Sequence, residues 1–200
     1  MKIRILTCLH PTKADSVSWA LRELDYFYCL HSILYFNRGK DILVYDNSLD
    51  DLFRLSNPPL LNLFLKDIQE WGGSELILRN FPNLYRENND DGFILLLEQV
   101  YDDTIAGEII LAINGRFKFY SDTLFKEISN YTDNMEVGTI YFVQTRFDRL
   151  NEADNFVFFK KGIKAFGDCK RQNLTIDVDL NMLRVNMVGD KIVSYRNFYK

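Results

Sequence analysis

The chain has 200 residues, of which 47% are hydrophobic and 26% are charged, and it carries a formal net charge of -4 at pH 7. This composition is typical of a globular domain with a sizeable core and excludes a disordered chain. The negative charge argues against non-specific binding of nucleic acid, which usually needs a basic face. The 16 Phe and 11 Tyr residues fit a filled core with aromatic crevice walls, so their number alone does not indicate a carbohydrate site.

Cysteine usage and the N-terminus indicate a soluble protein of the cytoplasm. Cys8, Cys29 and Cys169 are an odd number of thiols without metal-like spacing, which fits a reducing compartment better than a disulfide framework. Residues 1–7 are too short and too soon polar for a signal peptide. No apolar run approaches the roughly 18 residues of a membrane span, so we expect no transmembrane segment.

Strands and helices alternate through the first 115 residues. The first helix should begin at a cap formed by Asp15 or Ser16 and bury a stripe that includes Leu24, Tyr28 and Tyr35. Every connection between strands is long enough for a crossover, which favours parallel, right-handed pairs of Rossmann type. The expected strands are 3–9, 41–46, 75–78 and 108–113, and the later helices are 50–70 and 93–105, the last preceded by a polar loop over 80–91.

The pattern changes after residue 116. Apolar spacing predicts a helix at 121–130, a strand at 139–146, a helix at 151–164 and a final hairpin formed by 182–188 and 191–195. Gly189-Asp190 would form the tight turn of that hairpin. We find no repeat, low-complexity tract or linker. The sequence therefore predicts a single α/β domain over 1–200, with a mostly parallel central sheet flanked by helices.

Two of the expected strands end in polar residues. The second strand runs into Asp46-Asn47-Ser48, and the fourth runs into Asn114-Gly115-Arg116. Ligands of open parallel α/β sheets bind outside the carboxyl ends of the strands, and these side chains suit a base, a ribose or a phosphate. The alternative is that the first group begins a turn and caps a helix, while the second is a surface turn with a solvated arginine.

The common nucleotide-binding fingerprints are missing. No Gly-x-Gly-x-x-Gly follows the first strand and no P-loop is present, which disfavours simple NAD enzymes and P-loop enzymes. Thr7 and His10 nevertheless lie at the edge where they could touch a base or a phosphate, although a lone histidine beside a strand end is more often structural. Asp177 and Asp179 would face one side of an extended segment, where they could hold a divalent cation or act as general base. The alternative for that pair is a polar strand face.

Taken together, strand 3–7, the strand ending at Ser48 and the polar loop from Asn80 resemble the GT-A glycosyltransferases. The resemblance implies that the acidic residue after the second strand, here Asp46, binds the uracil or ribose of a nucleotide sugar. Residues 110–116, followed by Phe117 and Phe119, are similar to an Asn/Thr-Gly-Arg-Tyr/Phe stretch of some bacterial and viral polysaccharide-synthesis proteins. On this resemblance, 1–116 would be the nucleotide-binding half and 117–200 the acceptor-side half of one GT-A-like domain.

One departure from that family concerns the metal. Most GT-A enzymes carry Asp-x-Asp at the end of the fourth strand, where this chain reads Asn114-Gly115-Arg116. Three interpretations of this departure stay open. The enzyme could be metal-independent, with Arg116 neutralising the leaving diphosphate; a Mn or Mg ion could be held elsewhere; or activity could be lost.

The resemblance implies a glycosyltransferase that moves a sugar from a nucleotide-sugar donor to a glycan, a lipid-linked acceptor or another hydroxyl. Asp177 or Asp179 would deprotonate the acceptor, and Arg116 together with Arg79 would stabilise the departing diphosphate. Asn80 would join the donor site. Two alternatives remain: a nucleotide-sugar-binding or degenerate transferase module without turnover, and a structural or assembly domain without a ligand.

Overall fold

The computed structural model describes residues 1–7, 16–47, 77–80, 89–115, 117–145, 156–176, 182–184 and 193–194. The elements up to residue 114 are β1 (Lys2–Thr7), α1 (Ser16–Phe36), β2 (Ile42–Asp46), β3 (Ile77–Asn80), α3 (Asn89–Asp103) and β4 (Ile109–Asn114). The later strands are β5 (Phe117–Phe119), β6 (Thr139–Thr145), β7 (Phe156–Lys160), β8 (Lys170–Ile176), β9 (Met182–Arg184) and β10 (Val193–Ser194). Helix α4 (Thr123–Tyr131) and the 3-10 turns η1 (Thr132–Asn134) and η3 (Phe166–Asp168) complete the described elements.

The central sheet has seven strands in the order β3-β2-β1-β4-β7-β6-β8. The pairs β1/β2, β2/β3 and β1/β4 are parallel, as predicted for the first half, and β6/β8 is parallel as well. Only β7 runs antiparallel to its neighbours β4 and β6 in this sheet. From β1 the chain first adds strands on one side and then returns to place β4 on the other. The topological switch point therefore lies between β1 and β4.

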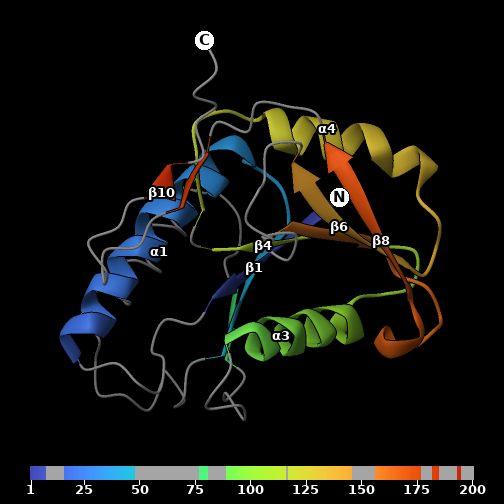
Figure 1. Ribbon diagram of the computed structural model, residues 1–200, viewed down its shortest axis with the longest axis horizontal. Helices are drawn as coiled ribbons and strands as arrows, with labels where there is room; N and C mark the ends of the chain where they lie inside the picture. Colours follow the sequence, from blue (N-terminus) through green and yellow to red (C-terminus); the bar gives the residue numbers. More distant parts are fainter. Residues whose placement is uncertain are drawn as a thin grey trace.

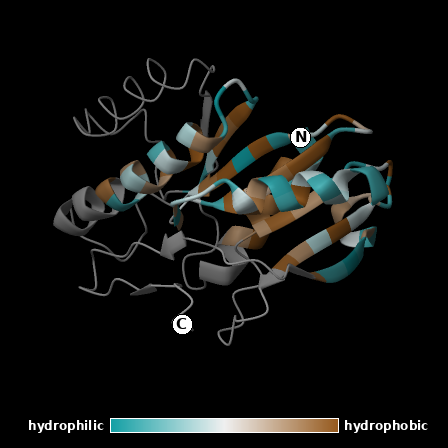
Figure 2. Cartoon of the chain, turned by 90° about the horizontal axis from the view of Figure 1, so that it is seen from above, coloured by the Kyte–Doolittle hydropathy of each residue, from teal (hydrophilic) through white to brown (hydrophobic). Residues whose placement is uncertain are grey.

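The sheet is the middle of three layers. Along β1, Ile3 and Ile5 face the core cluster that contains α1 and α4, whereas Leu6 faces the cluster that contains α3, as the two-residue period of a strand requires. In Figure 1, α3 lies below the central strands and α4 lies above them. Figure 2 shows hydrophobic residues concentrated on the strands and hydrophilic ones on the outward face of α4. Within the described residues, no helix combines the length and the apolar character that crossing a membrane requires.

The prediction of a helix at 151–164 is wrong, because residues 156–160 form strand β7. The run Phe156-Val157-Phe158-Phe159 is buried on both faces of the sheet, between β4 and β6. A fully buried strand of this length has no alternation, so spacing alone does not distinguish it from a buried helix segment. Its aromatic and β-branched residues were the better signal, since they are enriched in strands.

The buried face of α1 is also rotated from the expected stripe. Tyr28 and Tyr35 are 46% and 54% exposed, whereas Tyr26, Leu30 and Ile33 are buried against the sheet. Aromatic residues therefore occupy both faces of this helix, and the sequence pattern did not say which face the sheet would cover.

Smaller differences concern the ends of elements. Strand β3 extends to Asn80, and α3 begins at Asn89, so the polar loop expected over 80–91 is shorter at both ends. The expected helix at 50–70 lies outside the described residues, as does the turn Gly189-Asp190. The predicted hairpin is confirmed by the antiparallel pairing of β9 with β10, which continues into β5 as a second, three-stranded sheet.

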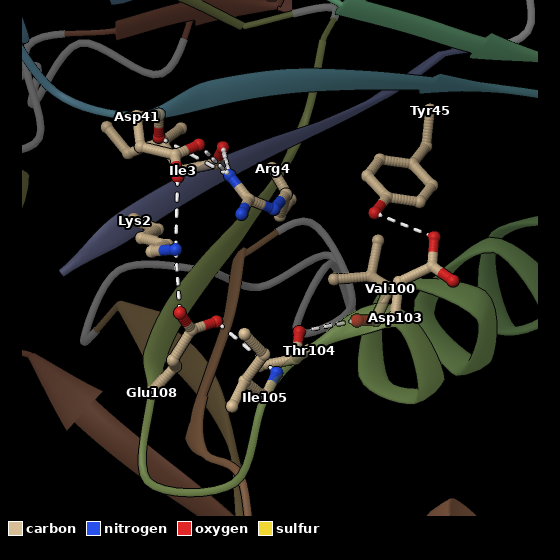
Figure 3. Close-up of polar contacts among 10 residues, drawn as sticks. All are labelled: Lys2, Ile3, Arg4, Asp41, Tyr45, Val100, Asp103, Thr104, Ile105 and Glu108. Carbon is tan, nitrogen blue, oxygen red and sulfur yellow. Dashed lines mark hydrogen bonds and ion pairs between the residues drawn. The ribbon is translucent and has the colours of Figure 1, made fainter.

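An ion-pair network holds the amino-terminal edge of the sheet together (Figure 3). Lys2 Nζ lies 2.6 Å from Glu108 and 3.2 Å from Asp41, and the buried Arg4 contacts Asp41 at 2.8 Å. The hydrogen bond from Lys2 lowers the pKa of Glu108. Burial alone would raise the pKa of Asp41, but hydrogen bonds from Arg4 and Lys2 outweigh burial and leave that pKa below its usual value. This network ties β1 to the start of β2 and β4 at the edge opposite the candidate site.

Candidate functional site

The predicted polar residues meet in one row at the carboxyl edge of the sheet. In the registers of β1, β2 and β3, Thr7 pairs with Asp46, and Asp46 pairs with Asn80. On the other side of β1, Asn114 pairs with Leu6. Four neighbouring strands therefore end together around the switch point between β1 and β4, which is where open α/β sheets bind ligands.

The floor of this site is a hydrogen bond between β1 and β2. Thr7 Oγ1 donates to Asp46 Oδ2 at 2.7 Å, and both side chains are buried, with Asp46 at 0% exposure. A hydroxyl donated to a carboxylate is a short, strong hydrogen bond, so it fixes the orientation of Asp46. In this arrangement Asp46 shapes the floor of the site rather than presenting an open carboxylate.

Asn47, which directly follows Asp46 at the end of β2, can still accept a hydrogen bond through its side chain. Its backbone N–H donates to the carbonyl of Thr7 at 3.1 Å, which pins the residue to the end of β1. Its side chain is only 8% exposed, yet Oδ1 has no hydrogen-bond partner within the described residues. A buried acceptor left unmatched costs about 1–3 kcal/mol. A ligand that donates a hydroxyl or an N–H to this oxygen would recover that energy.

Gly115 shapes the site through close packing. A Cβ atom here would lie 2.9 Å from Thr7 Cγ2, 2.9 Å from Tyr26 Cδ1 and 3.0 Å from Ile5 Cγ2. Its backbone N–H donates to the carbonyl of Leu6 at 2.9 Å. Its φ angle is not positive, so the turn itself does not require glycine. Gly115 therefore has a packing role, because α1 and β1 approach the end of β4 so closely that only a glycine fits.

Other predicted site residues cannot be assigned a position. His10, Ser48, Arg116, Asp177 and Asp179 lie outside the described residues. Arg79 and Asn80 are placed by their backbone in β3, which brings them to the same edge. The described residues contain no group of three His, Cys, Asp or Glu side chains that could hold a metal ion. The binding of a Mn or Mg ion and the roles predicted for the remaining residues stay predictions.

The sequence did not predict the positions of three tyrosines of α1. Tyr26, on the buried face of α1, forms one wall of the space around Gly115. Tyr28 and Tyr35 were expected in the core but line an open groove beside β5, together with Lys118 and Tyr120. Nothing in the sequence signalled this groove, because aromatic residues occupy both faces of α1.

Comparisons with known proteins concern the fold. No protein-family model matches the sequence, and no curated protein sequence matches it. A protein of Desulfovibrio desulfuricans G20, provisionally described as a nucleotide-diphospho-sugar transferase, is similar in structure with a TM-score of 0.46 and 12% identity, covering 90% of this chain and 84% of that one. TarS 1–349 of S. aureus is similar with a TM-score of 0.40 and 14% identity, covering 75% of this chain and 38% of that one.

Proposed function

We propose that this chain is a glycosyltransferase whose nucleotide-sugar donor binds at the carboxyl edge of β1, β2 and β4. The observation that carries the proposal is the buried, unmatched Oδ1 of Asn47 at this edge. It lies beside Asp46, whose carboxylate the hydroxyl of Thr7 holds in place. A ribose hydroxyl or a base N–H is the kind of donor that would satisfy the amide oxygen.

The reaction that fits this proposal is a displacement at the anomeric carbon of the donor sugar. A carboxylate, Asp177 or Asp179 in our proposal, takes the proton of the acceptor hydroxyl as its oxygen forms the new bond to the anomeric carbon. The bond from that carbon to the diphosphate oxygen breaks, and the electron pair leaves with the nucleoside diphosphate. Arg116 and Arg79 stabilise the charge that develops there. We assign no step to a metal ion.

Substitution of Arg116 tests this chemistry. Arg116→Ala should reduce transfer by roughly two to three orders of magnitude, as expected when a donor to the developing charge is lost, while the thermal stability of the protein stays unchanged. Release of the nucleoside diphosphate in the presence of acceptor measures the rate. Arg171→Ala, which changes an exposed arginine near the start of β8, is the matched control and should keep the full rate. Transfer by Arg116→Ala at the rate of the control would remove Arg116 from the mechanism.

A second candidate is a donor-binding module without turnover. It is favoured by Asn114, which stands where the family's acidic motif is expected, and by the tightly packed Gly115 that follows. Such a module would be stabilised by a nucleotide sugar, yet would neither transfer nor hydrolyse it across a panel of acceptors. Release of nucleoside diphosphate by the unaltered chain, lost on substitution of Asn47, would instead support the proposal that the chain is an enzyme.

A further inference from the structure

A groove of about 450 Å³ lies between α1 and β5, away from the floor formed by Thr7 and Asp46. One wall is the face of α1 that carries Tyr28, His31 and Tyr35 at positions i, i+3 and i+7. The other wall is β5 and the residue after it. Phe119 N donates to Ser32 Oγ at 2.9 Å, which fixes the strand alongside the helix. In size the groove falls within the range of ligand sites.

The strand and the helix both turn aromatic rings toward this groove. Along β5, Phe117 and Phe119 are buried in the core, so Lys118 and Tyr120 take the alternate side of the strand. Tyr28, Tyr35 and Tyr120 are 46%, 54% and 48% exposed. Exposed aromatic surface that collects in one place marks an interaction site, whereas single exposed apolar residues do not.

Tyr28 and Tyr35 each pack against the aromatic ring of a neighbouring residue. Tyr28 meets Phe27 edge to face, with centroids 5.9 Å apart, and Tyr35 meets Phe36 in the same way at 5.0 Å. Because they lie seven residues apart, the two tyrosines are separated by about 10 Å along the helix axis, a distance that a short oligosaccharide can span. The exposed part of each ring can contact the C–H surface of a sugar, and each phenol hydroxyl can bond to a sugar hydroxyl.

The charges along the groove are positive. Lys118 Nζ lies 5.7 Å from the ring centroid of Tyr28 and 5.4 Å from that of Tyr120, so one cation stands between two tyrosine rings. Arg38 lies over the ring of Tyr35 at 5.4 Å, which places a second cation beside the groove. None of the described residues that line it is acidic. This arrangement is complementary to a ligand that combines sugar rings with negative charge.

We propose that this groove binds an acidic saccharide, with Tyr28, Tyr35 and Tyr120 stacking on sugar rings and Lys118 pairing with a carboxylate or phosphate. The proposal rests on the proposed function in one respect, the identification of this saccharide as the glycan acceptor. The groove would hold the acceptor chain on the α1 side of the donor site. It would favour acidic acceptors over neutral ones.

Calorimetric titration of the full chain with trigalacturonate, a hyaluronan tetrasaccharide and neutral maltotriose tests the proposal. An acidic saccharide should bind at least about tenfold more tightly than maltotriose, and Lys118→Met should abolish that preference. Tyr35→Ala and Tyr120→Ala should weaken binding of every saccharide by about tenfold. Tyr131→Ala, which removes an exposed tyrosine of α4 outside the groove, is the matched control and should bind as the unaltered chain does.

The same variants should keep their thermal stabilisation by nucleotide sugars, which separates the groove from the donor site. Absence of binding by both acidic saccharides, or binding that the Lys118, Tyr35 and Tyr120 substitutions leave unchanged, would overturn the proposal for the groove. The proposal for the groove would also be overturned if a nucleotide bound the chain and these substitutions abolished that binding. If nucleotide sugars did not stabilise the unaltered chain while the saccharides still bound the groove, the proposed donor site would be refuted instead.

Discussion

Replacing Gly115 with alanine probes whether close packing at the switch point shapes the site. The added Cβ would lie 2.9 Å from both Thr7 Cγ2 and Tyr26 Cδ1 and 3.0 Å from Ile5 Cγ2. These distances are too short for carbon atoms in contact, so the neighbours must move. All three are buried, with exposures of 2%, 2% and 0%, and side chains in a close-packed interior move only at a cost.

The expected cost is therefore that of overpacking a tight core. Inserting one carbon into such a site costs about 1–3 kcal/mol, and we expect the upper part of that range because three buried side chains are affected. For a domain of this length each kcal/mol lowers Tm by roughly 2–4 °C, which gives a total decrease of roughly 4–12 °C. Displacement of Thr7 should also disturb its hydrogen bond to Asp46, so nucleotide affinity should fall together with stability.

Thermal and urea unfolding of Gly115→Ala and Gly167→Ala measure this effect. Gly167 has no atom within 4 Å of an added Cβ and has no positive φ, so its alanine variant should stay within about 0.5 kcal/mol of the original chain. Equal stability of the two variants would refute the packing role of Gly115. A destabilised Gly115→Ala that binds nucleotides with full affinity would refute its link to the site.

Two further predictions concern the two ends of β1. Thr7→Val, which keeps the side-chain shape but removes the hydroxyl donated to Asp46, should cost about 1–3 kcal/mol in urea unfolding, whereas Thr7→Ser should recover most of it. If Thr7→Ser were as unstable as Thr7→Val, the methyl group rather than the hydrogen bond would account for the stability. At the other end, the lowered pKa values of Asp41 and Glu108 stabilise the folded chain at pH above their unfolded values of about 4. This contribution, at most about 1 kcal/mol because the pairs are partly exposed, should vanish as the pH falls through the folded pKa values. Asp41→Asn should therefore show a smaller loss of unfolding free energy between pH 5 and pH 3, roughly the range in which these carboxyls are protonated, and an unchanged loss would contradict this.

Periodicity and connection length predicted the parallel core of the fold. The strands β1, β2 and β4 lie within a residue or two of their expected ranges, because each is a short apolar run bounded by turn residues. The error at β7 has a physical cause: a strand covered on both faces, like Phe156 to Phe159, loses the alternation that identifies it. The antiparallel insertion of β7 beside β4 is a long-range pairing that no local pattern specifies.

The candidate site was predictable in position but not in detail. Strand ends rich in polar residues located Thr7, Asp46 and Asn114 at one edge, since parallel strands end together. The burial of Asp46 and the packing of Gly115 depend on register and on the approach of α1, neither of which is encoded locally. The same holds for the groove, because aromatic residues on both faces of α1 left its orientation undetermined.

The most direct test of the donor site is thermal stability of the chain with nucleoside diphosphates and nucleotide sugars, each with and without manganese. A ligand at about 100 times its dissociation constant should add roughly 2.7 kcal/mol, which corresponds to an increase in Tm of roughly 5–11 °C. We predict this increase for one nucleotide family, with a clear reduction in Asn47→Ala, whose unmatched Oδ1 is the proposed contact. Absence of stabilisation by every nucleotide would contradict the donor site at this edge of the sheet.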